Sequence, residues 1–146
     1  MPAADAPDKV SIVVFSGGFE RVHYALATAA AAVASNVPAT LFFTMGAARA
    51  LCAAGADGLP AWHRLPVEEG AGAAETDAMF RGRGIAGFEE LLDACVALGV
   101  RFMACEMGLK ALAIDPADLR SDIPLAAGGL VTFLADASKH GAVVFV

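Results

Sequence analysis

The sequence lacks the features that mark several common classes of protein. No apolar run reaches the roughly 20 residues of a membrane-spanning helix, and the longest candidate, residues 24–34, also contains Thr28. The N-terminus has an early acidic residue and no apolar segment, unlike a secretory signal, so we expect a cytoplasmic protein. Lysine and arginine number 10 against 16 acidic residues, and the net charge of −6 argues against nucleic-acid binding.

Metal and nucleotide signatures are missing as well. Cys52, Cys95 and Cys105 form neither a CxxC pair nor a His/Cys cluster with zinc spacing. An odd number of cysteines in a cytoplasmic protein does not suggest a disulfide scaffold. The glycine turn at 16–18 lacks a Walker lysine and the full GxGxxG pattern of dinucleotide-binding proteins. We therefore expect no metal and no cofactor.

Apolar residues, in contrast, are abundant, at 58% without counting the 15 glycines. Ordinary soluble domains reach about 45–50% with glycine included. A chain of 146 residues most simply forms one domain, 1–146, which would struggle to bury so much apolar surface within itself. We expect the excess to lie between the subunits of a homo-oligomer, with membrane contact as the second interpretation.

Two hydrophobic periodicities alternate along the chain. Short apolar or β-branched runs predict five strands, at 9–15, 39–44, 100–105, 123–127 and 142–146. Helical spacing predicts helices after the 16–18 turn, over 45–54, between 87 and 99, from 105 to about 113, and between 129 and 140. Gly55 and Gly99 should end the second and third of these helices, and Asp115-Pro116 should start a further one. This alternation predicts an α/β fold, a Rossmann-like three-layer sandwich around a mainly parallel five-stranded sheet.

Two segments fall outside this alternation. Residues 55–86 are rich in glycine, carry scattered charge and show no steady period, so they predict a long loop with one helical turn near 76–80. Residues 1–8 are predicted to be a mobile N-terminus. In the last predicted helix, Leu130, Phe133, Leu134 and Ala137 share one apolar face.

Parallel strands place all their carboxyl ends on one edge of the sheet, where α/β proteins collect ligands and chemistry. That edge should bring Cys105 together with two glycine turns, Ser16-Gly17-Gly18 and Gly128-Gly129. The backbone N–H groups of the turns could bind an anion. The plain alternative is that the glycines only permit tight turns.

Cys105 ends a predicted strand at the start of a helix, and this position leaves its role open. Unpaired N–H groups at a helix start favour a reactive thiolate, whereas the neighbouring Glu106 disfavours it and Lys110 partly offsets Glu106. Cys95 lies on the apolar stripe of its helix and Cys52 in an alanine-rich helix, so packing is the better interpretation of both. A reactive Cys105 would be alkylated ahead of the other two.

Three blocks of sequence carry a resemblance to a known family. They are VVFSGGFERVHYALATAAAAVASNVPATLFFTMGAARAL at 13–51, FEELLDACVALGVRFMACEMGLKALAI at 88–114 and GGLVTFLADASKHGAVVFV at 128–146. Together they resemble the DsrE/DsrF-like family, most closely its branch of small stand-alone sulfur-relay proteins, sometimes labelled peroxiredoxin-family proteins. The resemblance covers nearly the whole chain.

The resemblance implies a domain that assembles into homotrimers or hexamers and carries sulfane sulfur on a cysteine as a persulfide or thiosulfonate. The matching cysteine is Cys105. Cys95 matches a second cysteine of some relatives, which makes it a candidate accessory thiol. The implied function is a sulfur-relay protein, or a sulfurtransferase if it turns over, that exchanges sulfur with a TusA-like carrier. The two glycine turns would then stabilise the carried anion.

The chain departs from the family pattern in two places. Residues 64–86 contain four acidic residues where several relatives are rich in Met and Lys, and Glu-Met-Gly-Leu follows Cys105 where relatives often have small polar residues. The alternative function is a non-catalytic oligomeric module that binds a small anionic ligand or nucleotide at the carboxyl edge of the sheet. In that alternative, Cys105 only packs.

Overall fold

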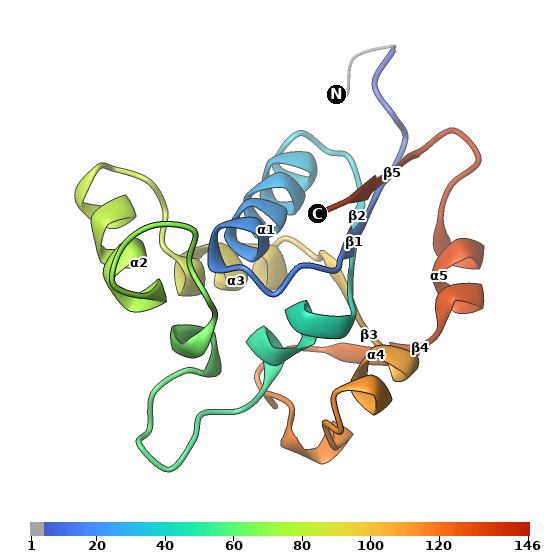
Figure 1. The fold of residues 1–146 in the computed structure, drawn as a ribbon. Coiled ribbons are helices and arrows are strands. Elements are labelled where there is room, and N and C mark those ends of the chain that lie inside the picture. The colour runs from blue at the N-terminus through green and yellow to red at the C-terminus, as the bar shows by residue number, and fades with distance from the viewer. Residues whose placement is uncertain (1–4) are drawn as a thin grey trace.

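The computed structural model describes residues 5–146, and its centre is a five-stranded sheet (Figure 1). The strands are β1 (Val10–Val14), β2 (Ala39–Phe43), β3 (Arg101–Cys105), β4 (Leu125–Gly128) and β5 (Ala142–Phe145). They lie in the order β4-β3-β2-β1-β5, and every neighbouring pair is parallel. The predicted sheet is confirmed, and all five carboxyl ends meet at one edge. Part of the predicted mobile N-terminus, 1–8, lies outside the described residues.

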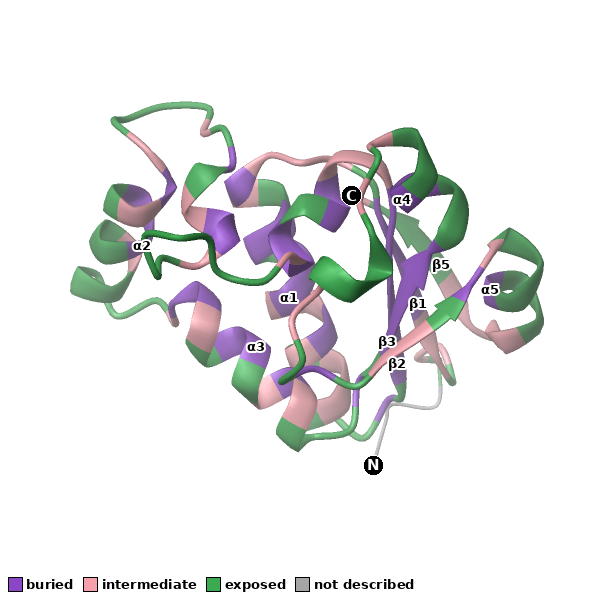
Figure 2. Cartoon of the chain, turned by 90° about the horizontal axis from the view of Figure 1, so that it is seen from below, coloured by how far each residue is buried: buried purple, intermediate pink, exposed green. Residues whose placement is uncertain are grey.

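Helices cover the two faces of the sheet unequally (Figure 2). One face carries α1 (Phe19–Ala34) and α3 (Phe88–Ala97), with α2 (Ala73–Gly82) and the 3₁₀ helices η1 (Met45–Leu51) and η2 (Ala61–Arg64) beside them. Within the described residues, the opposite face carries only α5 (Leu130–Asp136). Two short helices, α4 (Glu106–Ala111) and η3 (Pro116–Asp118), follow β3. The predicted three-layer α/β fold is present, with a thin third layer.

Side chains along the central strands alternate between the two faces, as the pleat of a strand requires. Ile12 and Phe102 belong to the larger core beneath α1 and α3, whereas Val13 and Phe42 belong to a small cluster beneath α5. Because both faces of these strands are buried, their sequences are almost continuously apolar. This pattern made the strands predictable.

The residues predicted to share the apolar face of the last helix are mostly not buried. Of the seven residues of α5, Phe133 alone is buried, while Leu130 and Leu134 are 47% and 64% exposed. α5 is too short, and too isolated on its face of the sheet, to cover its own apolar residues. The third layer therefore leaves apolar surface open to solvent.

The helix predicted over 45–54 is wrong in type and in length. It is the 3₁₀ helix η1, and it ends at Leu51 rather than at Gly55. The next residues pair with another segment instead of continuing the helix. The carbonyl of Leu51 accepts a hydrogen bond from the amide of Arg120 (2.8 Å). The amide of Ala53 donates one to the backbone carbonyl of Asp118 (2.7 Å).

The segment 55–86, predicted as a long loop, contains η2 and the ten-residue helix α2 rather than one turn near 76–80. Its sequence signal is weak because the buried residues of α2 are small or polar. Asp77 is buried in α2 and accepts a hydrogen bond from the amide of Phe88 (2.7 Å), so it holds the start of α3. Phe80 stacks on Phe19 of α1, with 6.1 Å between ring centroids.

Other helix boundaries follow the predicted signals. Gly99 follows α3 with a positive φ of 83°, a conformation that favours glycine. Asp115 precedes Pro116 at the start of η3, and its carboxylate accepts a hydrogen bond from the amide of Ala117 (2.9 Å). None of the helices within residues 5–146 is both long and apolar enough to cross a membrane.

Candidate functional site

Cys105 is the last residue of β3 and lies at the carboxyl edge of the sheet. In the register of the sheet it pairs with Gly128, the last residue of β4. The glycine turn at 16–18 follows β1 and reaches the same edge, but β2 lies between β1 and β3. The structure thus brings Cys105 beside Gly128 and separates both from Ser16-Gly17-Gly18 by a strand.

The thiol of Cys105 is buried beneath α5. The residue is 2% exposed and belongs to the cluster that contains Phe42, Met103 and Phe133. Phe133 stacks on Phe42 with 4.8 Å between ring centroids, and it is the one buried residue of α5. In this arrangement the sulfur is closed to a reacting molecule, and Phe133 of α5 is part of the cluster around it.

The turn that leads into α5 combines a crowded glycine with an open one. A Cβ added to Gly128 would lie 3.0 Å from the Cε of Met103 and 3.1 Å from the Cβ of Thr132. Nothing lies within 4 Å of a Cβ added to Gly129, which occupies the N-cap position of α5. Close packing therefore explains why residue 128 is a glycine, whereas a side chain at residue 129 would have space.

The other end of α5 is fixed to the sheet through Asp136. Its carboxylate accepts hydrogen bonds from Lys9 Nζ (2.8 Å), Thr40 Oγ1 (2.6 Å) and Arg101 Nη1 (2.7 Å). These donors stand at or beside the starts of β1, β2 and β3. Burial raises the pKa of Asp136, but hydrogen bonds from Lys9 and Thr40 outweigh it, so the pKa lies below its ordinary value.

α4 begins directly after Cys105, which occupies its N-cap position. Gly108 packs so closely on the start of η1 that an added Cβ would lie 2.5 Å from both the Met45 nitrogen and Thr44 Oγ1. This contact fixes α4 against the end of β2. Glu106 is exposed, and no ion pair joins it to Lys110 among residues 5–146.

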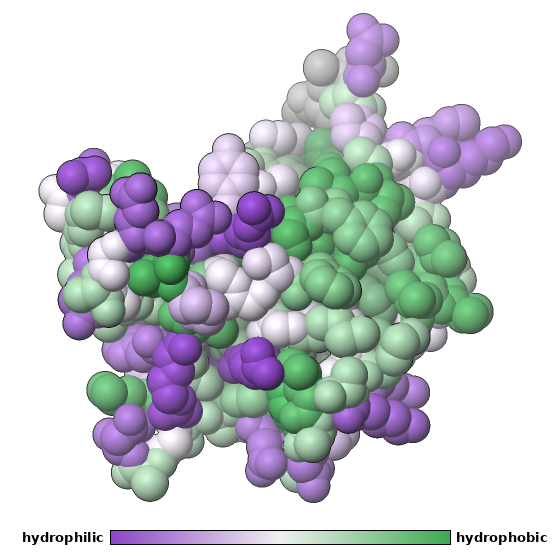
Figure 3. All heavy atoms as spheres, in the orientation of Figure 1, coloured by the Kyte–Doolittle hydropathy of each residue, from purple (hydrophilic) through white to green (hydrophobic). Residues whose placement is uncertain are grey.

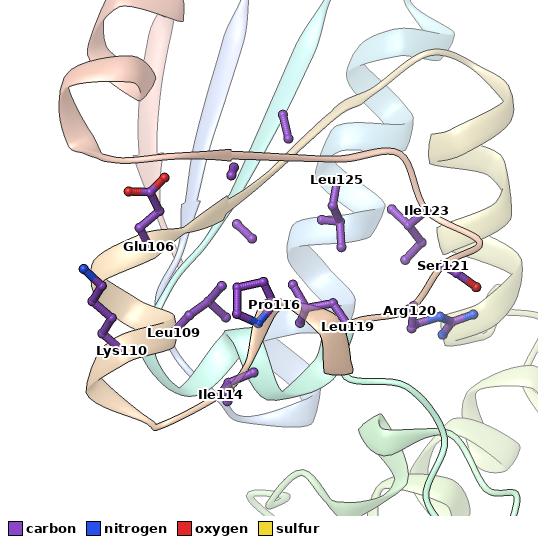
Figure 4. Close-up of a pocket in the computed structure, with 13 residues that line it drawn as sticks. Glu106, Leu109, Lys110, Ile114, Pro116, Leu119, Arg120, Ser121, Ile123 and Leu125 are labelled. Carbon is purple, nitrogen blue, oxygen red and sulfur yellow. The ribbon is translucent and has the colours of Figure 1, made fainter.

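An apolar cavity of about 580 Å³ lies beside β3 and β4, and Cys105 is not among the residues that line it (Figure 4). Ala104 lines it, and successive residues of a strand point to opposite faces of the sheet. Glu106 and Lys110 lie at one end of the cavity and Arg120 at the other. The apolar wall is formed by Leu109, Ile114, Pro116, Leu119, Ile123 and Leu125. The thiol of Cys105 therefore lies outside this cavity.

A second cavity, of about 810 Å³, opens beside the glycine turn at 16–18. A Cβ added to Gly17 would lie 2.9 Å from the carbonyl oxygen of Gly46, so close backbone packing explains this glycine. The first amide of α1, that of Phe19, already donates to the carbonyl of Pro66 (2.9 Å). One backbone N–H group that could have bound an anion is thus already paired within the chain. The cavity lining adds three arginines to the turn, namely Arg21, Arg49 and Arg64.

The two other cysteines differ sharply in environment. Cys95 is 0% exposed in the core beneath α1 and α3, and burial raises its pKa to about 11. Cys52 follows η1 instead of lying within a helix, is half-buried, and lines the second cavity. Burial and then the charge of Asp118 raise the pKa of Cys52, against Arg64 and Arg49, which lower it. Cys52, not Cys105, is the most accessible thiol.

The described residues place neither a metal-ligand cluster nor the side chain of His23 beside Cys105. No three His, Cys, Asp or Glu side chains between residues 5 and 146 come together as metal ligands do. His23 is buried, and its Nε2 lies 2.8 Å from the carbonyl oxygen of Ala86. Its ring packs against Phe80 of α2, 5.0 Å between centroids.

A family model described as the DsrE/DsrF/DrsH-like family matches residues 63–145, more than half of the chain. The chain belongs to this family. The matched region contains Cys95, Cys105 and Gly128, but neither Cys52 nor the 16–18 turn. No match was found among curated proteins.

Two solved structures are similar to this DsrE/DsrF-like chain over nearly its whole length. The protein of unknown function MTH1491 from Methanobacterium thermoautotrophicum has a TM-score of 0.60 and 14% identity, covering 94% of this chain and 98% of its own. The ychN protein from E. coli has a TM-score of 0.55 and 18% identity, with the same coverage. Identities this low show a shared fold and nothing finer.

Sequence reasoning missed the three arginines of the second cavity. They lie far apart along the chain, so no spacing motif joins them. A weak signal did exist, because Arg21 and Arg49 each follow the carboxyl end of a strand by a few residues. Arg64 belongs to η2, within the segment predicted as a loop, and only the fold brings it to the cavity.

Proposed function

We propose that this protein is a sulfur-relay protein in which Cys105 accepts sulfane sulfur and passes it to a TusA-like carrier. Members of the DsrE/DsrF-like family generally act in sulfur relay. The observation that carries the proposal is the position of Cys105. It ends β3 at the carboxyl edge, forms the N-cap of α4, and lies inside the family match.

The proposed loading step is a thiol–persulfide exchange. The Cys105 thiolate attacks the outer sulfur of a donor persulfide, R–S–SH, and a new sulfur–sulfur bond forms at Cys105 Sγ. The sulfur–sulfur bond of the donor breaks, and its electron pair leaves with the donor as R–S⁻. No external oxidant or reductant is required. The reverse exchange with a carrier thiol unloads Cys105.

Burial of the thiol gives the relay a closed state. The persulfide on Cys105 would lie beneath Phe133, away from solvent thiols that would otherwise remove its sulfur. Loading and unloading would require α5 to swing away, and Gly129 has the free space expected of a hinge. In the assembly proposed below, this movement would also open the contact that α5 makes with a neighbouring subunit. The moving segment would run from Gly129 to Asp136, and the hydrogen bonds of Asp136 hold its far end to the sheet in the closed state.

We further propose that the protein assembles into a homotrimer or hexamer through the thinly covered face. Apolar side chains gather there over β5 and α5 (Figure 3). The large exposed apolar residues of this region are Phe15, Leu130, Val131, Leu134, Val143 and Phe145. A patch of this kind on a chain of net charge −6 is typical of a subunit interface.

Light scattering tests the assembly. The wild type should have several times the 14.8 kDa mass of one chain. Val131 is 83% exposed, so Val131→Glu should reduce the mass while changing the stability of the single chain by no more than about 0.5 kcal/mol. A wild-type monomer at micromolar concentration would contradict this part of the proposal.

Intact-mass spectrometry tests the sulfur-carrying residue. After exposure to a low-molecular-weight persulfide, the wild type should gain about 32 Da per sulfur atom, the increment of cysteine persulfidation. The Cys52→Ser variant should gain the same mass, and Cys105→Ser should gain none that survives removal of the donor. A stable adduct on Cys105→Ser would contradict the assignment.

An accessory role for Cys95 stays a prediction. Cys95 and Cys105 lie in separate clusters on opposite faces of the sheet, so their sulfurs are not in contact. Reduced loading of Cys105 in the Cys95→Ser variant would support the role. Loading at the wild-type level in that variant would remove it.

A further inference from the structure

The cavity beside the 16–18 turn has the opposite charge to the protein as a whole. Its lining includes Arg21, Arg49 and Arg64 and a single acidic residue, Glu68. The whole chain has only 10 Lys and Arg residues against 16 acidic ones. Three of those ten cations surround one cavity, drawn from α1, η1 and η2. The fold thus gathers positive charge at a single place in an acidic protein.

Acidic side chains hold two of the three guanidinium groups only weakly. Arg21 Nε lies 3.8 Å from Glu68, and Arg64 Nη1 lies 3.7 Å from Asp57, and all four of these side chains are more than half exposed. Exposed pairs at such distances contribute little stability, so a ligand can displace them at small cost. Arg49 forms no ion pair within the described part of the chain.

We propose that this cavity binds a small organic anion with two or more acidic groups, next to the thiol of Cys52. Arginine binds carboxylate and phosphate through paired hydrogen bonds, and three arginines exceed what one acidic group requires. The volume of about 810 Å³ is in the range of sites for small molecules of cofactor size, far larger than a single inorganic anion. Leu65 and Val67 give the lining an apolar part for the body of such a ligand.

The site is distinct from the proposed sulfur-carrying site. Cys105 is buried under α5 on the other face of the sheet, whereas Cys52 lines the arginine cavity. Arg49 and Arg64 lie near enough to Cys52 for their charges to act on its thiol. A ligand held by these arginines should therefore cover Cys52, which makes this cysteine a built-in reporter of occupancy.

Protection of Cys52 from iodoacetamide tests the proposal. Two probes separate the sources of acidic groups, ADP for phosphates and S-methylglutathione for carboxylates. At about ten times its dissociation constant, a bound probe should slow the labelling of Cys52 about tenfold. Inorganic phosphate should protect less than the better organic probe. Because the reporter is Cys52, the result does not depend on whether Cys105 carries sulfur.

Matched variants show whether the arginines are responsible. Arg49→Gln and Arg64→Gln should each weaken binding of the protecting probe by about tenfold or more, as expected for loss of a hydrogen bond between charged groups. Arg83→Gln, an exposed arginine at the end of α2 outside the cavity, should leave binding unchanged. For each variant, the labelling rate of Cys52 with the probe is divided by the rate of the same variant without the probe. Failure of both probes to protect Cys52 at millimolar concentration, or equal binding by all three variants, would overturn the proposal.

Discussion

Replacing Phe133 by alanine should uncover Cys105 without unfolding the protein. Phe133 is 2% exposed, stacks on Phe42, and is the only buried residue of α5. Truncation of a buried phenylalanine costs about 3–5 kcal/mol, and we take about 3 because α5 lies on a partly open face. If that contact exists only while α5 is docked, the population with α5 displaced rises by about 100-fold.

Alkylation by iodoacetamide followed by peptide mapping measures this population. Labelling of a buried thiol follows the open fraction when opening and closing are faster than the chemical step. Cys105 should therefore be labelled about 100-fold faster in Phe133→Ala, and no more than about tenfold faster in Phe133→Leu, which keeps an apolar side chain. Cys95, in the core on the opposite face, should keep its wild-type rate.

Two outcomes would refute this reasoning. Unchanged labelling of Cys105 in Phe133→Ala would mean that α5 does not control access to the thiol. A parallel rise for Cys105 and Cys95 would mean that the substitution acts by global unfolding. The selective rise of Cys105 is the only result that supports an α5 gate.

Two further predictions concern the contacts that hold α5 and α4. Asp136→Asn should lower the free energy of unfolding in urea by about 1–2 kcal/mol, because it removes the charged acceptor of a partly buried network in which Arg101 is half exposed. The exposed Asp93→Asn should have no such effect. Since the folded-state pKa of Asp136 is lowered, its contribution is complete above the unfolded value of about 3.9 and is lost as pH falls through the folded value. Wild type should thus lose more stability in that acid range than Asp136→Asn, which keeps only the contributions of other carboxylates with lowered pKa values, such as Glu89 and Asp122. Acid curves that fall by the same amount would contradict the network. Gly108→Ala should cost about 2 kcal/mol or more, because its Cβ would meet Met45 and Thr44, whereas Gly82→Ala, with open space, should be neutral or slightly stabilising. Thermal unfolding checks this pair, and equal midpoints would contradict the close packing of α4.

Much of the fold could be predicted from the sequence because the central strands are buried on both faces. Their apolar runs fixed the number and order of strands along the chain, and residues such as Gly99 and Asp115 marked helix ends by known backbone rules. The segments that were predicted wrongly depend on contacts distant in sequence. η1 stops where Leu51 pairs with Arg120, and α2 is held by the buried carboxylate of Asp77.

The candidate site could be predicted only in its outline. The carboxyl edge of the sheet and the place of Cys105 on it follow from strand and helix patterns. The burial of that thiol could not, because it depends on Phe133 docking from a helix that starts 25 residues later. Cys52, interpreted from its sequence position as a packing residue, also lines a cavity, which only the fold reveals.

The most direct test of the relay is a transfer experiment. Protein loaded with sulfur and freed of donor is mixed with a TusA-like carrier that has one thiol, and the masses of both proteins are followed with time. About 32 Da should leave this chain and appear on the carrier, from wild type and Cys52→Ser alike, and Cys105→Ser should transfer nothing. Transfer from Cys105→Ser at the wild-type rate would contradict the central role of Cys105.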